Sequence, residues 1–86
     1  MSTVELLEQA LALAKRLGYV VRQEWLGGSG GGACEVKGQK LLFLDLAQSP
    51  LDHLDQVVDM LRREAEAGNL PLPQPLQDLL KRRRAA

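Results

Sequence analysis

The sequence predicts an α+β fold with a helix, a three-stranded antiparallel meander, a second helix and a short C-terminal helix. Two segments with the apolar spacing of helices each begin at a serine, and three strand-like segments joined through glycines lie between them. Since the chain has only 86 residues, we expect one α+β domain over residues 1–69. Residues 70–86 are predicted to be a proline-rich connector and a short basic helix.

The first helix is predicted to begin after Ser2 and to end at Gly18. Ser2 and Glu5 have the spacing of a capping box, in which side-chain oxygens satisfy the free amides of a helix start. Glycine then accepts the left-handed conformation that ends many helices. The apolar stripe of this helix comprises Leu6, Leu7, Ala10, Leu11, Leu13, Ala14 and Leu17.

Three strands are predicted over residues 19–26, 33–37 and 40–46 because β-branched, aromatic and alternating apolar residues gather there. Gly38 and Gln39 form the predicted turn between the last two, of type II′ because glycine comes first. The third strand is apolar on both faces, so each face needs cover. In a meander of order 1-2-3 this strand also lies at an edge.

The second helix is predicted from Ser49 to about Ala67, with serine as its cap and Pro50 at its first position. Asp52 suits the positive end of the helix dipole. Asp52, Asp55 and Asp59 are interpreted as a solvated face and not as metal ligands. The apolar side comprises Leu51, Leu54, Val57, Val58, Leu61 and Ala65, and the short C-terminal helix offers Leu76, Leu79 and Leu80.

Composition excludes several classes of protein. No apolar run is long enough for a membrane span and no signal peptide is evident, so we expect a cytoplasmic protein without a membrane partner. Eleven basic residues balance eleven acidic ones, so binding of nucleic acid is not expected over the chain as a whole. If it occurs, it should involve only the basic residues Lys81, Arg82, Arg83 and Arg84. One cysteine and one histidine fall short of a structural zinc site, and no metal or cofactor is predicted.

Residues 27–32 hold five glycines and Ser29, whose backbone amides could converge on an anion. A P-loop would continue with lysine and serine or threonine, and a dinucleotide fingerprint would open into a helix, whereas a strand follows here. A flexible connection is therefore the preferred interpretation. The alternative is a small-ligand or anion site made by Gly28, Ser29, Gly30, Gly31, Cys34 and His53.

Cys34 also allows an enzymatic alternative. Its thiolate would be the nucleophile, His53 the base and the loop amides an oxyanion hole. A core thiol and a boundary imidazole are the simpler interpretation. No catalytic residue is assigned, because no set of residues meets the pattern of an acid/base pair, a triad or a metal shell.

The sequence instead favours a non-catalytic interaction or regulatory module that self-associates. An apolar edge strand aggregates unless something covers it. Either the C-terminal helix or the same strand of a second copy could cover the predicted edge, whose apolar residues are Leu42, Leu44 and Leu46. We expect a homodimer, and beyond it a protein partner that the sequence does not identify.

Three motifs carry a resemblance to small bacterial proteins of unassigned function. It spans roughly residues 11–64 and implies a compact α+β domain without adding an activity. The motifs are Leu17-Gly18-Tyr19-Val20-Val21-Arg22, Cys34-x-Val36-Lys37-Gly38 and Leu42-Phe43-Leu44-Asp45.

The order of elements also resembles the opening of minimal zincin-type metallopeptidase domains in bacterial stress regulators. Those domains carry His-Glu-x-x-His on the helix after the strands. Here His53 matches the first histidine, but Leu54 replaces the glutamate and Val57 the second histidine. The resemblance therefore concerns the scaffold only.

Overall fold

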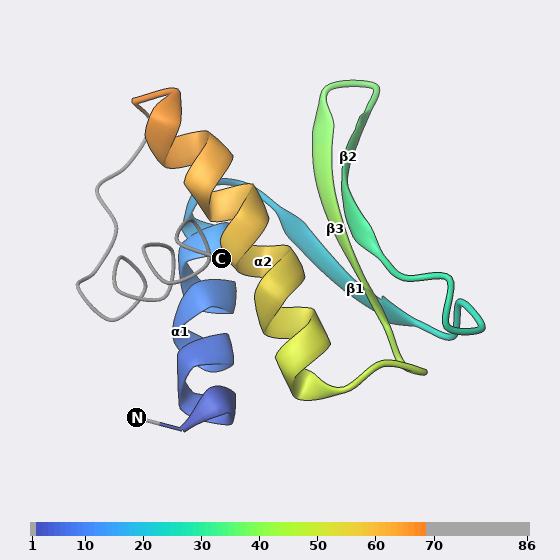
Figure 1. The fold of residues 1–86 in the computed structure, drawn as a ribbon. Coiled ribbons are helices and arrows are strands. Elements are labelled where there is room, and N and C mark those ends of the chain that lie inside the picture. Colours follow the sequence, from blue (N-terminus) through green and yellow to red (C-terminus); the bar gives the residue numbers. More distant parts are fainter. Residues whose placement is uncertain (1, 69–86) are drawn as a thin grey trace.

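The structure is a computed structural model that describes residues 2–68. Two helices lie side by side against a three-stranded sheet, as Figure 1 shows, so the α+β class is confirmed. The predicted connector and C-terminal helix lie outside the described residues. The elements are α1 (Thr3–Arg16), β1 (Val20–Glu24), β2 (Gly32–Val36), β3 (Gln39–Asp45) and α2 (Pro50–Glu66).

Both helix starts are confirmed. The Ser2 hydroxyl accepts the backbone N–H of Glu5 at 3.1 Å, and the Glu5 carboxylate accepts the backbone N–H of Ser2 in return. Ser49 and Asp52 form the same reciprocal pair at the start of α2, where proline takes the first turn. Local side-chain chemistry therefore fixes where each helix begins.

The predicted antiparallel meander is wrong. The sheet is mixed and has the order β1-β3-β2, with β1 parallel and β2 antiparallel to β3. The edges are β1 and β2, while β3, predicted as an edge, is the central strand. The physical reason is that β3 has apolar residues on both faces. In the central position it forms hydrogen bonds with β1 on one side and β2 on the other, while one of its faces packs on the helices.

The β2–β3 hairpin is confirmed, but its turn lies one residue earlier than predicted. Val36 pairs with Gln39, so Lys37 and Gly38 are the two turn residues. Their φ angles are +51° and +80°, and two positive values identify a type I′ turn rather than type II′. The shift places Glu35 directly opposite Lys40.

The core lies between the helices and one face of the sheet. Its buried apolar side chains are Ala10, Ala14, Leu42, Leu44, Leu54, Val57, Val58, Met60 and Leu61. Alternation turns Leu41 and Phe43 to the opposite face, where they are only half-buried. The prediction that both faces of β3 are covered is therefore correct only for the face that packs on the helices.

Among residues 2–68, neither helix has the length and apolar character needed to cross a bilayer.

Candidate functional site

The glycine loop is held in place by the buried carboxylate of Asp45, at the end of β3. This carboxylate accepts backbone N–H groups from Leu26 at 3.1 Å, Gly30 at 3.1 Å and Ala47 at 2.9 Å. The Gly30 amide of the loop, which could have bound an external anion, therefore binds an internal one. This arrangement favours a structural role for the loop.

Backbone N–H groups around Asp45 also set its charge state. Burial by itself would raise the pKa of this carboxyl. The backbone N–H groups of Ala47, Leu26, Gly30 and Gly28 outweigh the effect of burial and hold the pKa below its ordinary value. The Asp45 carboxyl is thus ionised at neutral pH.

Gly31 lies against the backbone of β3. A Cβ at this position would overlap the carbonyl oxygen of Phe43, so only glycine fits there. Behind the loop, Gln56 Nε2 donates to Gln48 Oε1 at 2.8 Å, and both side chains lie within 4 Å of the position that a Cβ would take at Gly30. The loop is therefore packed as well as hydrogen-bonded.

The loop forms one wall of an apolar groove of about 360 Å³. Leu26, Phe43 and Cys34 line it together with residues 30–32 of the loop. Three of the predicted ligand residues, Gly30, Gly31 and Cys34, are thus brought together. Cys34 is exposed and, paired with Leu41, turns its thiol to the face that the helices leave open.

The other predicted ligand residues lie elsewhere. Gly28 and Ser29 are exposed at the loop tip, and the Ser29 hydroxyl donates to the carbonyl of Leu26 at 2.7 Å. His53 lies on α2, where its Nε2 is 2.6 Å from the carbonyl oxygen of Asp45. Because α2 covers the face opposite to the Cys34 thiol, the two residues of the enzymatic alternative are not brought together.

The sheet order also buries two of the three residues that were predicted for self-association. Leu42 and Leu44 are buried beneath the helices, at 0% and 1% exposure, because β3 is central. A surface that would bind another molecule cannot include them. Leu46 is half-exposed just beyond the strand.

Within the described range, no group of three or more histidine, cysteine, aspartate or glutamate side chains is arranged to hold a metal ion. Of the acidic residues on α2, Asp52 caps the helix and Asp59 accepts from Arg62 at 3.1 Å.

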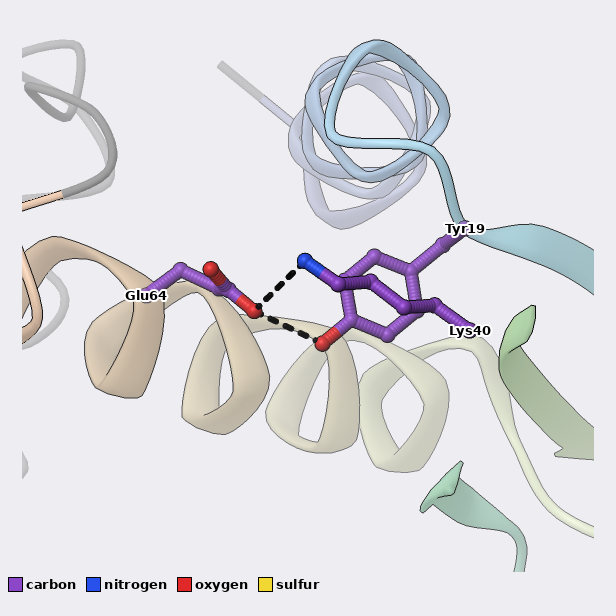
Figure 2. Close-up of polar contacts among 3 residues, drawn as sticks. All are labelled: Tyr19, Lys40 and Glu64. Carbon is purple, nitrogen blue, oxygen red and sulfur yellow. Dashed lines mark hydrogen bonds and ion pairs between the residues drawn. The ribbon is translucent and has the colours of Figure 1, made fainter. Parts of the chain in front are cut away.

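A polar cleft of about 390 Å³, which the sequence patterns do not indicate, separates the C-terminal half of α2 from the β2–β3 hairpin. Figure 2 shows its central contacts, which join Tyr19, just before β1, to Lys40 in β3 and Glu64 in α2. The Tyr19 hydroxyl donates to Glu64 Oε1 at 2.9 Å, and Lys40 Nζ lies 3.6 Å from the same oxygen. Lys40 also lies over the Tyr19 ring, 5.4 Å from its centroid.

This environment changes the acidity of Tyr19. Burial raises its pKa to about 12, and the hydrogen bond to Glu64 and the charge of that carboxylate act in the same direction. Tyr19 is thus a neutral hydrogen-bond donor at physiological pH. Sequence spacing does not reveal the contact, because 45 positions separate Tyr19 from Glu64.

Comparison with protein-family models, with curated proteins and with solved structures finds no match to this chain.

Proposed function

We propose that the protein is a non-catalytic interaction module that self-associates, with two copies pairing antiparallel along the outer edge of β2. The observation that carries the proposal is the sheet order, which leaves β2 at an edge beside an apolar face that no described helix covers. An unpaired strand edge is a template for another strand. A second copy supplies such a strand and makes a closed, two-fold assembly.

The two edge strands of the sheet, β1 and β2, differ in how well their side chains prevent pairing with another strand. β1 carries Arg22 and Glu24, whose side chains form an ion pair at 3.1 Å on the open face. Charges of this kind discourage pairing at an edge. β2 contains one charged residue, Glu35, and otherwise consists of glycine, alanine, cysteine and valine. The edge that accepts pairing more readily is therefore β2.

The positions of the charges select the register. Pairing centred on Cys34 aligns all five residues of β2 and places Glu35 opposite the partner's Ala33. A register centred on Glu35 would oppose two carboxylates, which is unfavourable. In the favoured register the two Cys34 residues face each other, at a separation that a disulfide can span.

Pairing of this kind also extends the apolar surface. Val36, which is 50% exposed, would lie opposite the partner's Gly32 on the open face. The helix-free faces of the two copies would join into one six-stranded surface that includes both grooves beside Phe43. Edge pairing buries less than about 1,200 Å² in total, the range of weak and transient complexes.

Sedimentation velocity under reducing conditions tests the proposal. We expect the mass to rise from 9.5 kDa toward twice that value as protein concentration increases to about 200 µM. Cys34→Lys puts two like charges at the two-fold axis and should weaken association at least about tenfold. It leaves the fold intact, because Cys34 is exposed.

Val20→Lys is the matched control, since Val20 lies on the same open face at the opposite edge and is 42% exposed. It should leave association unchanged. A wild-type chain that stays monomeric throughout the concentration range overturns the proposal. If both lysine variants dissociate the complex equally, the copies pack face to face and edge pairing is wrong.

A further inference from the structure

The cleft between α2 and the hairpin has two walls that each carry one cation and one anion. Lys40 and Glu35 are opposite each other on the sheet wall, and Arg63 and Glu64 are consecutive on the helix wall. The charges of the described lining residues therefore sum to zero. Ala33 on the sheet wall and Ala67 at the end of the helix wall add small apolar surfaces to the cleft, and the core residue Met60 lies behind them.

From this arrangement we infer that the cleft binds a small zwitterion of the α-amino acid class. The carboxylate of the ligand lies against Lys40 and Arg63, its ammonium group against Glu35, and its side chain against Ala33 and Ala67. A neutral cleft with both signs of charge suits a ligand with both signs, whereas a polyanion such as a nucleotide requires an excess of positive charge. The volume of about 390 Å³ lies within the range of small-molecule sites.

Lys40 is positioned to bind a ligand. Its Nζ is 3.6 Å from Glu64 Oε1, which is beyond the 2.7–3.2 Å of a well-formed N–H···O bond. The Tyr19 hydroxyl already donates to that oxygen at 2.9 Å. The ammonium group of Lys40 therefore keeps donors for a ligand carboxylate while the tyrosine ring and Glu64 fix its position, as Figure 2 shows.

The site differs from the proposed pairing edge in the side chains that it uses. Glu35 points to the helix side of β2, whereas the Cys34 thiol points to the open face. The failure of either proposal can therefore be observed without the failure of the other. Ligand binding is measured on a single chain, and self-association is measured without ligand.

The test is a titration of the full chain with neutral amino acids such as leucine and methionine. Binding is measured by calorimetry and by changes in backbone NMR shifts. The decisive comparison uses leucine, 3-methylbutylamine and 4-methylpentanoic acid, which share an apolar group and differ in their charges. Leucine should bind at least about tenfold more tightly than either analogue, because each lacks one charge-assisted hydrogen bond. The shifts should centre on the start of β3 and on Arg63.

Two variants test which side chains bind the carboxylate and the ammonium group of the ligand. Lys40→Met should weaken leucine binding about tenfold, and Glu35→Gln should do the same while leaving the affinity for 4-methylpentanoic acid unchanged. Lys37→Asn is the matched control, since it removes a lysine from the same hairpin outside the cleft. No binding by any amino acid, or equal binding of leucine and both analogues, overturns the inference.

Discussion

Replacing Gly31 by alanine should destabilise the protein strongly, and the structure gives the reason. The added Cβ would overlap the carbonyl oxygen of Phe43, a backbone atom of the central strand. A side chain can rotate away from such an overlap, but a backbone carbonyl within a sheet cannot. The glycine loop must therefore lift from β3.

The magnitude follows from the kind of contact. Adding a methyl group to a packed site usually costs about 1–3 kcal/mol, and a backbone neighbour that cannot move places Gly31→Ala near about 3 kcal/mol. A domain of this size is stable by only about 5–10 kcal/mol. The midpoint of thermal unfolding should fall by about 15 °C, since 1 kcal/mol shifts it by about 4–8 °C in a small domain.

The assay is thermal and urea unfolding followed by circular dichroism, with Gly27→Ala as the control from the same loop. Gly27 has a φ of +68° and nothing within 4 Å of its Cβ position. Alanine there meets only the strain of a left-handed conformation, about 1 kcal/mol. If the two variants unfold at the same temperature, the close approach of Gly31 to β3 is not a feature of the folded protein.

Two further predictions concern ionisable groups, the buried Asp45 and the half-buried Tyr19. Because the folded pKa of Asp45 lies below its ordinary 3.8, its stabilising effect is present above that pH and is lost as pH falls through the folded value. Asp45→Asn should therefore lower stability at pH 7 and make the acid side of the stability profile shallower, as urea unfolding at several pH values would show. Tyr19, whose folded pKa is about 12, should stabilise the fold fully below pH 10 and lose this effect between pH 10 and 12. Its absorbance titration should shift to lower pH in Glu64→Gln, and an unshifted curve would contradict the contact.

The helices were predictable because their determinants are local. Ser2 with Glu5 and Ser49 with Asp52 satisfy the free amides of the same helix turn that they begin. The helix ends were predictable for the same reason, since Gly18 and Gly68 adopt the left-handed conformation that the sequence indicates. Such features need no information about the rest of the chain.

The sheet order was not predictable by the same reasoning, because it is a choice between non-local pairings. A short connection favours pairing of successive strands, but the glycine segment between β1 and β2 is long enough to allow another order. The apolar character of β3 is evident from the sequence, but it is compatible both with a covered edge and with a central strand. The same residues are better explained by a central position, where Leu42 and Leu44 pack beneath the helices.

The candidate sites show the same division between local and non-local features. The glycine loop was identified from composition, but the anion it binds is Asp45, which the sequence places 15 residues after Gly30. Nothing near either residue in the sequence indicates this contact. The polar cleft depends likewise on the order of the strands and on a turn that lies one residue earlier than predicted, because that turn sets Glu35 opposite Lys40.

The central part of β2 connects the two proposals. Ala33 and Glu35 turn toward the cleft, and Cys34 between them lies at the centre of the proposed pairing edge. A change in the position of this strand would therefore act on both the cleft and the pairing edge. If self-association changes the affinity for the ligand by some factor, linkage requires the ligand to change self-association by the same factor.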